Sequence, residues 1–244
     1  MLLMYHRLYV SSILLGFLLD LGQTNVLKNI RMLEPLVREV LPLPRKLHRR
    51  AGRLGTLDEV EALFPGFKAF LDATEQEIPR PKDKGKRRTH YSGKRKRHTV
   101  KTQITVNADG LIAHKTPHVR GSRHDYALFK WRHPRLPDDV CLGLDLGYDG
   151  IQNDYSMFNA LVPYKRRSPG RGKRDVKAKE LTCEQKAFNR WLSGERVVVE
   201  HTISRVKKFR IMEHRFRNRL RHYDTVTDIV CGLVNLRIIG IAAL

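Results

Sequence analysis

Acidic residues are scarce in this chain. Its 244 residues include 25 Asp and Glu against 47 Lys and Arg, which gives a formal net charge of +22. Charge of this size on a folded chain is typical of proteins that bind a polyanion, such as DNA, RNA or an anionic membrane. The hydrophobic fraction of 41% is enough for a core and excludes a wholly disordered chain. We therefore expect a globular protein that binds nucleic acid.

Cysteine and long hydrophobic runs are also rare. The three cysteines stand far apart with no C-x-x-C pair, which argues against a zinc finger or a disulfide framework and for a reducing cytosol. The most apolar stretch, residues 1–19, has about a dozen uninterrupted apolar or small residues, whereas a membrane span needs about 20. We expect a soluble helix in this stretch, no membrane partner and a cytoplasmic protein.

Residues 10–42 are predicted to form two helices joined at the sequence DLGQT. An apolar stripe along the second helix and the glycine in the joint support this assignment. The outline is typical of a helix-turn-helix, although a plain helical hairpin has the same pattern. If the unit binds DNA, base edges and phosphates would meet the polar residues at the front of the second helix, namely Gln23, Asn25, Lys28 and Asn29.

The helical periodicity ends at LPLPRKLHRRAGRLGT, residues 41–56. Two prolines and a basic run there are typical of a linker. We place a domain boundary near residue 60. Residues 1–60 would then form a helical DNA-binding region with a basic linker, and residues 61–244 a second domain.

Strand patterns dominate the second domain. GFKAFLDATEQ (66–76) predicts a first strand, and residues 99–118 predict two more, turned at the ADG of residues 108–110. A short helix opening at Ser122, an apolar strand in DDVCLGLDLGYDG, a fifth strand in ALVPYK and a long helix over residues 181–209 follow. This order is that of an α/β ribonuclease H-like fold, which has a mixed five-stranded sheet and flanking helices.

Two aspartates are expected to meet at one edge of this sheet. The first and fourth strands lie side by side in such a fold, so Asp72 and Asp145 would emerge at neighbouring strand ends. Two carboxylates in a small space repel each other, and a divalent cation with oxygen-seeking coordination removes the repulsion. We therefore expect Mg²⁺ or Mn²⁺. A single aspartate is also common in turns and caps, so the interpretation depends on a third acidic residue.

The third candidate is in the long helix. At about 100° per residue, Arg196, Glu200 and Lys207 point to the same side. An exposed ion pair between Arg196 and Glu200 would explain two of them. Their neighbours, however, are apolar almost all round, which predicts a packed helix that tolerates few idle charges.

Four blocks of the sequence resemble a known family. FLDATEQEI, GSRHDYALF, LDLGYDG and RVVVEHTISRVKKFR are similar to blocks of the DDE transposases of the insertion sequence 5 group, which include the Harbinger relatives of plants and animals. The resemblance runs from about residue 8 to the end. Its most specific part is the Arg-x3-Glu-x6-Lys spacing of Arg196, Glu200 and Lys207, whereas Ser193 stands where the larger signature has a tyrosine.

The resemblance implies the transposase of a bacterial insertion sequence, which binds terminal repeats and catalyses metal-dependent DNA cleavage and strand transfer. Asp72, Asp145 and Glu200 would be catalytic and would hold two Mg²⁺ or Mn²⁺ ions per site. Arg196 and Lys207 would neutralise DNA phosphates beside them. The implied partners are the double-stranded DNA of the terminal repeats and of the target, with further copies of the chain, and the implied location is the bacterial nucleoid.

Rival carboxylates stand near each candidate. Asp149 is the second choice for Asp145, and Glu195 is the rival of Glu200, although it lies about 140° away on the helix. Asp125, at a helix start, is most simply an end cap, with a supporting role near the site as the alternative.

Two basic segments are predicted to grip DNA without reading its sequence. The first, residues 82–101, offers Lys84, Lys86, Arg87, Arg88, Lys94, Arg95 and Lys96. The second, YKRRSPGRGKR at residues 164–174, has the composition of a flexible loop.

Two other functions share many of these features. A regulator or a domesticated transposase would bind DNA without cutting it, and it would have no use for three acidic groups at one place. A ribonuclease H-like nuclease would cut without strand transfer, and it would have little use for an N-terminal unit that recognises DNA ends.

Overall fold

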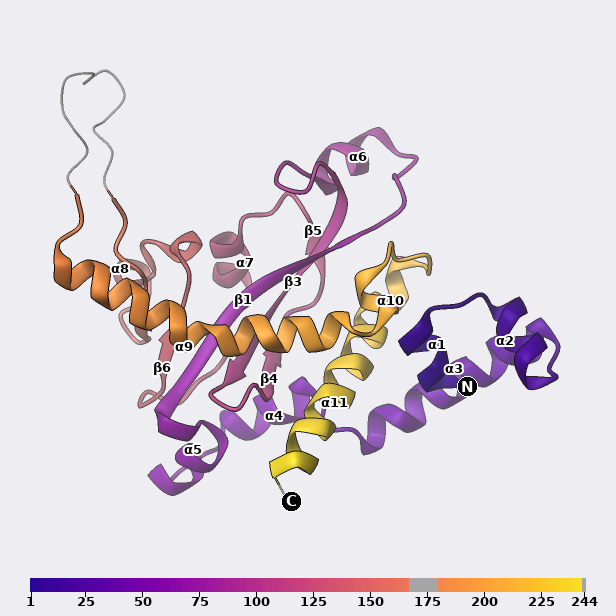
Figure 1. Ribbon diagram of the computed structural model, residues 1–244, viewed down its shortest axis with the longest axis horizontal. Coiled ribbons are helices and arrows are strands. Elements are labelled where there is room, and N and C mark those ends of the chain that lie inside the picture. The colour runs from indigo at the N-terminus through magenta and orange to yellow at the C-terminus, as the bar shows by residue number, and fades with distance from the viewer. Residues whose placement is uncertain (167–179, 243–244) are drawn as a thin grey trace.

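The segments in which apolar and polar residues alternate form strands of one mixed sheet (Figure 1). The computed structural model describes residues 1–166 and 180–242. The sheet has seven strands, with the order β2-β3-β1-β6-β7 and with β4 and β5 also paired to β3. The strands are β1 (Lys68–Glu77), β2 (Tyr91–Ser92), β3 (Arg97–Asn107), β4 (Ile112–Lys115), β5 (Val119–Arg120), β6 (Cys141–Gly143) and β7 (Asn159–Leu161).

The strand directions follow the predicted order. Strand β1 pairs antiparallel with β3 on one side and parallel with β6 on the other, and β6 pairs parallel with β7. The predicted hairpin is β3 and β4, and its turn uses Gly110 at φ 85°, a left-handed conformation that glycine adopts without strain. The mixed α/β class is confirmed. The short strands β2 and β5 were not predicted from the sequence.

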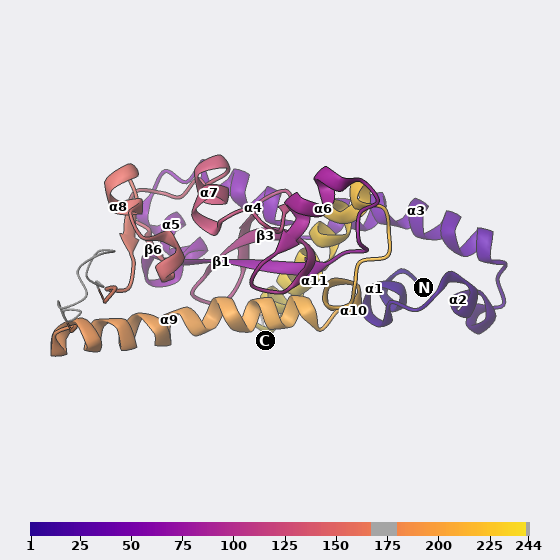
Figure 2. The same cartoon turned by 90° about the horizontal axis from the view of Figure 1, so that it is seen from above.

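Helices cover both faces of the sheet. In Figure 2 the long helix α9 runs along one side of the strands, and α7 and α8 lie on the other. The described part of the chain has no helix that is long and apolar enough to cross a membrane. The helices are α1 (Leu2–Leu8), α2 (Ser12–Leu19), α3 (Gln23–Val40), α4 (Pro44–Ala51), α5 (Leu57–Leu63), α6 (Lys84–His90), α7 (Asp125–Trp131), α8 (Ile151–Asp154), α9 (Cys183–Lys207), α10 (Arg210–Glu213) and α11 (Tyr223–Ala242).

The alternation of β1 divides the apolar core in two. Phe70 packs in the cluster that contains Val199 of α9 and Val230 of α11. Its neighbours Ala69 and Leu71 point to the other face, into the cluster covered by α5, α7 and α8. Successive side chains of this one strand therefore lie on opposite sides of the sheet, and Asp72 falls on the same face as Phe70 and α9.

The two helices predicted over residues 10–42 are present as α2 and α3. Val26 and Ile30 of α3 are buried in the same cluster as residues of α10 and α11, and the hydroxyl of Tyr5 donates a hydrogen bond of 2.9 Å to Asn218 Oδ1. The N-terminal helices thus share a core with the C-terminal ones. The domain boundary near residue 60 stays a prediction.

The stretch expected to be a linker contains helix α4 instead. Pro44 occupies the first turn of this helix, a position where its missing N–H costs nothing, so it begins the helix rather than breaking it. Leu47 and Ala51 are four residues apart on one face and pack into the cluster beneath β4. The helix expected from Ser122 begins at Asp125, and part of the first basic segment forms α6.

A group of buried and half-buried charged side chains connects α11 to β4 of the sheet and to α3. The ammonium of Lys115, on β4, lies 3.4 Å from Asp224 and 3.2 Å from Asp228, and Arg38 of α3 lies 3.1 Å from Asp228. His118 contributes both its backbone N–H and its ring nitrogen to Asp224, at 2.9 and 2.8 Å. Burial alone would raise the pKa of Asp224, but the hydrogen bond from His118 and the charge of Lys115 outweigh it and bring the pKa down to about 2.

We expect Asp224→Asn to remove part of the pH dependence of stability. Because the pKa of Asp224 in the folded protein lies below its ordinary value, its contribution is present above about pH 4 and is lost as the pH falls towards 2. Urea unfolding between pH 6 and pH 2.5 should show the wild type losing more stability than Asp224→Asn. The exposed Asp139→Asn variant is the control and should follow the wild type. Equal acid sensitivity of wild type and Asp224→Asn would contradict the assignment.

Candidate active site

The parallel pairing of β1 with β6 brings two of the predicted acidic residues together. Phe70 is paired with Gly143, and Asp72 and Asp145 each stand two residues farther along their own chains. Strand β6 has ended at this point, and Asp145 caps the short turn that follows, with Oδ1 accepting a hydrogen bond of 2.7 Å from Gly147 N. Oδ1 of Asp72 accepts one of 2.7 Å from the N–H of Ala73. Asp145 thus follows the end of its strand as expected, whereas Asp72 lies in the middle of β1 and not at a strand end, because β1 continues to Glu77 along β3.

Several charged groups near Asp72 affect the pKa of its carboxyl. Burial raises the pKa of the Asp72 carboxyl to about 6, although the hydrogen bond from Ala73 and the Arg196 guanidinium act in the opposite direction. The carboxylates of Asp145 and Asp125 add to the rise. Asp72 therefore lies within the electrostatic reach of two other carboxylates and one arginine.

Tyr148 is a buried residue close to these carboxylates. Its side chain is fully buried, and its hydroxyl accepts a hydrogen bond of 2.7 Å from Gln103 Nε2. Burial raises the pKa of this phenol far above its ordinary value, and Asp125, Asp72 and Asp145 raise it further. Gln103 also donates a hydrogen bond of 2.6 Å to the backbone carbonyl of Asp125, and this bond connects the start of α7 to the sheet.

Asp125 is not the end cap that was expected, because His124 occupies the cap position of α7 and Asp125 begins its first turn, where an ion pair holds it. The Lys101 ammonium, on β3, lies 2.7 Å from Asp125 and 3.5 Å from Glu75. It also donates a hydrogen bond of 2.7 Å to the backbone carbonyl of Arg123. The side chains of Lys101 and Glu75 are 9% and 10% exposed. The Thr99 hydroxyl donates a hydrogen bond of 2.8 Å to the carboxylate of Glu75.

The third predicted acidic residue lies on α9, outside the pair of aspartates. The buried Val199 and Val206 point α9 to the sheet, and Arg196, Glu200 and Lys207 lie on one flank of that face. Arg196 is the member that acts on Asp72. Glu200 is exposed, and in residues 1–166 and 180–242 no three His, Cys, Asp or Glu side chains are close enough to hold a metal ion. Glu200 as a member of the site remains a prediction.

The rival carboxylates are engaged elsewhere. Glu195 accepts a contact of 2.7 Å from the Lys68 ammonium on the other flank of α9. Asp149 is exposed and lies 3.9 Å from the Lys165 ammonium. Their positions give no reason to prefer them to Glu200 and Asp145.

The predicted DNA-binding side chains are almost all at the surface. Gln23, Asn25 and Lys28 are exposed in the first turns of α3. The first basic segment projects from one end of the sheet, with Lys86, Arg87 and Arg88 on α6 and with Lys94, Arg95 and Lys96 between β2 and β3; of these only Arg87 is half-buried. Most of the second basic segment, residues 164–174, lies outside the described residues.

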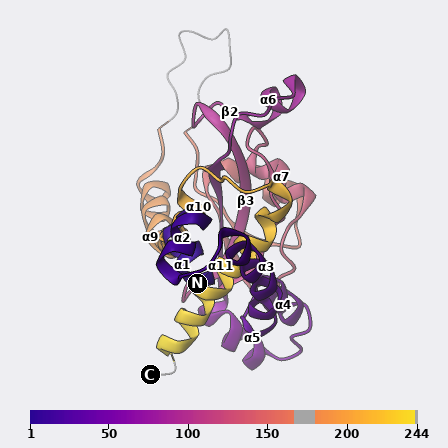
Figure 3. The same cartoon turned by 90° about the vertical axis from the view of Figure 1, so that its right-hand side faces the viewer.

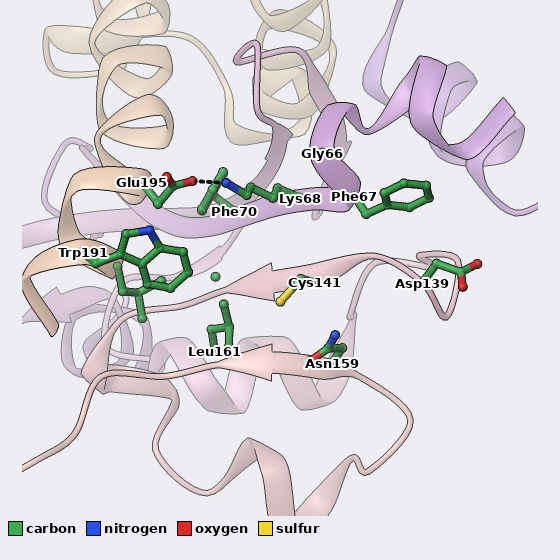
Figure 4. Close-up of a pocket in the computed structure, with 12 residues that line it drawn as sticks. Gly66, Phe67, Lys68, Phe70, Asp139, Cys141, Asn159, Leu161, Trp191 and Glu195 are labelled. Atoms are coloured by element: carbon green, nitrogen blue, oxygen red, sulfur yellow. Dashed lines mark hydrogen bonds and ion pairs between the residues drawn. The ribbon is translucent and has the colours of Figure 1, made fainter. Parts of the chain in front are cut away.

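A mainly apolar pocket of about 270 Å³ lies near the starts of β1, β6 and β7 (Figure 4). Trp191 and Glu195 reach into it from α9, and the ion pair between Lys68 and Glu195 crosses it. None of Asp72, Asp145 and Glu200 is among its lining residues. The pocket is thus separate from the paired aspartates.

The sequence has recognisable relatives. Residues 71–235 match the model of a family described as DDE superfamily endonuclease. The chain belongs to this family. The matched region begins one residue before Asp72 and includes Asp145 and Glu200.

A curated protein is also similar to this chain. The chain is 33% identical over 165 residues to the probable transposase for insertion sequence element IS702 of Microchaete diplosiphon, a match that covers 68% of this chain and 55% of the relative. The chain therefore spans about half the length of that relative. No solved structure matches the chain.

Sequence reasoning missed three residues that support the aspartates: Lys101, Gln103 and Tyr148. No signal for the first two was present in the sequence, because Lys101 and Gln103 occupy the polar positions of the alternation along β3, which are typical of a face turned to solvent. In the structure that face is buried as well, so both side chains require partners. Tyr148 was interpreted only as a sign that the chain turns. The burial of Tyr148 depends on its contact with Phe129 of α7, and no local sequence pattern predicts that contact.

We expect Lys101→Met to destabilise the fold by about 3–5 kcal/mol, because it leaves Glu75 and Asp125 beside each other without a buried counter-charge. Urea unfolding at pH 7 measures this. Lys84→Met, at an exposed position on α6, is the matched control and should change stability by less than about 0.5 kcal/mol. Similar stability of the two variants would show that Lys101 does not hold this group together.

Proposed function

We propose that the chain is a transposase that cuts the DNA ends of its element and joins them to a target. The observation that carries this proposal is the β1 and β6 register, which sets Asp72 beside Asp145 inside the region that matches an endonuclease family. The relative named as a probable transposase supports joining as well as cutting. The strand order, antiparallel first and then parallel, supports a ribonuclease H-like catalytic domain.

The side chains at the proposed site fit divalent cations. Asp72 is crowded by two other carboxylates, and a divalent cation with oxygen ligands would relieve that repulsion. Asp72, Asp145 and Glu200 would hold two Mg²⁺ or Mn²⁺ ions, which when bound activate the attacking oxygen and stabilise the leaving oxygen of an in-line displacement at phosphorus.

The cationic side chains of α9 would hold the DNA strand. Arg196 acts on Asp72, and its Nε is buried without a hydrogen-bond partner in the described part of the chain. A guanidinium with an unused donor beside a carboxylate site suits a phosphate oxygen. Lys207, 3.5 Å from Glu213 at the end of the helix, would neutralise a second phosphate.

The remaining expectations concern DNA recognition and assembly. Residues 1–60 would act as a helix-turn-helix region, with Gln23, Asn25 and Lys28 reading the terminal repeat. The exposed cations of residues 82–96 would hold the backbone of either duplex. Two ends must be cut together, so the DNA complex would contain more than one copy of the chain.

A binding protein that has lost cleavage is the second candidate, and it is favoured by the exposed position of Glu200 apart from the aspartates. A nuclease without strand transfer is the third. A cleavage assay distinguishes a transposase from the binding protein, and a strand-transfer assay distinguishes it from the nuclease.

We expect Asp72→Asn, Asp145→Asn and Glu200→Gln each to lower cleavage by more than about a hundredfold while DNA binding persists, because loss even of groups that only support metal ligands costs about 10–100-fold. The measurement is nicking and strand transfer on end-labelled terminal-repeat DNA with Mg²⁺, Mn²⁺ or EDTA. Glu195→Gln and Asp149→Asn are matched controls and should retain activity. A Glu200→Gln variant that cuts normally would remove Glu200 from the site, and a wild type that binds but never cuts would favour the binding protein.

We expect the loss of the α3 side chains and the loss of the α6 cations to change DNA binding in different ways. Replacing Gln23, Asn25 and Lys28 together with alanine should reduce the preference for terminal-repeat over random duplex. Replacing Lys86, Arg87 and Arg88 should weaken binding to both and lower the slope of log affinity against log salt by about 0.9 per lost phosphate contact. Fluorescence anisotropy at several salt concentrations measures both effects. An unchanged preference in the first variant would contradict recognition by α3.

A further inference from the structure

Strand β2 and helix α6 stand at one end of the sheet (Figure 3). A second cavity lies at this end, on the face of β1 opposite α9. Its volume is about 440 Å³, within the range of roughly 300–1,000 Å³ of sites for small molecules. Three segments form its walls: Ala73 and Glu75 of β1, residues 91–95 after α6 and residues 121–125 before α7, with Lys101 at its base. Ala73 directly follows Asp72, although the two side chains lie on opposite faces of β1. The cavity residue Asp125 is one of the carboxylates that raise the pKa of Asp72, so the cavity lies close to the candidate active site but on the other side of β1.

The base of this cavity accepts hydrogen bonds and repels anions. Lys101 stands between Glu75 and Asp125, at 3.5 and 2.7 Å, so one positive charge faces two negative ones. A free phosphate would meet this net negative charge. Carboxylate oxygens instead accept hydrogen bonds from N–H groups, such as the amino groups of nucleobases.

The mouth of the cavity has the opposite character. Lys94 and Arg95 are exposed there, and the Arg123 guanidinium lies 5.2 Å from the Trp131 ring centre. Tyr91 also lines the cavity, with 43% of its surface exposed. Cations at the opening suit a phosphate, and an exposed aromatic ring suits a stacked base.

We propose that this cavity binds one unpaired nucleotide of DNA, with its base directed to Glu75 and Asp125 and its phosphate at Lys94 and Arg95. Adenine, cytosine and guanine each carry an amino group with two N–H donors, one for each carboxylate, whereas thymine has a single N–H donor on its ring. The inference rests on the proposed function, because it takes the DNA of a transposase as the ligand and gives an unpaired nucleotide a place outside the duplex.

The test compares two short single-stranded oligonucleotides with the same fluorescent label at one end: one contains one 2-aminopurine, and the other has an abasic position there. Binding is measured in EDTA by anisotropy. Wild type should bind the intact strand about tenfold more tightly than the abasic strand. Tyr91→Ala should lose that difference, and Tyr91→Phe should keep it, because stacking needs the ring but not its hydroxyl. Lys84→Ala, a cation outside the cavity, should weaken both strands equally.

Equal affinity of wild type for the intact and abasic strands would overturn the proposal, and this comparison needs no variant. An equal loss for both strands in Tyr91→Ala, with circular dichroism unchanged, would also overturn it, because Tyr91 would then serve the backbone and not the base. The assay requires neither metal nor cleavage. Failure of the carboxylate variants to alter cutting would therefore refute the proposed catalytic site without touching this result, and the reverse also holds.

Discussion

Three backbone pairs between β1 and β6 set the arrangement on which the candidate site depends. They place Asp72 opposite Asp145, and a shift of one residue would turn Asp72 to the other face of the sheet. The register is held by close packing, because a side chain at Gly143 would come within 2.6 Å of the Phe70 ring. Helix α9 lies on this same face, so the register also decides that Arg196 is the cation beside Asp72.

The charge of the chain is distributed unevenly, and this unevenness is the basis of the proposed function. Most cations of residues 82–96 are at the surface, where they can meet phosphates. Near the carboxyl end of β6, by contrast, lie the carboxylates of Asp72, Asp145 and Asp125, and Glu75 stands farther along β1. Lys101 joins the last two across the sheet. Carboxylates that repel one another inside a protein with a net charge of +22 represent an electrostatic cost that a bound cation would lower.

Elements with strong local signals could be predicted, and those that depend on distant partners could not. Helix α9 carries a capping box between Thr182 and Gln185 and ends near its predicted limit. The β3 and β4 hairpin has its glycine at the turn. Helix α4 was missed because its prolines and basic residues are typical of a linker, and only packing against β4 makes it a helix. The support of Tyr148 and Lys101 was missed because their partners are distant in sequence.

The sequence by itself determined the mixed α/β class, the order of the strands and the expectation of a DDE endonuclease, because periodicity, turn residues and the spacing of Arg196, Glu200 and Lys207 are local properties. Membership of the family is confirmed for residues 71–235. Only the tertiary structure decided which charges meet. It set Asp72 beside Asp145 and Arg196, left Glu200 exposed, joined the N-terminal helices to α10 and α11, and buried Lys101 between Glu75 and Asp125. Such contacts depend on strand register and on the packing of distant helices, which no short stretch of sequence specifies.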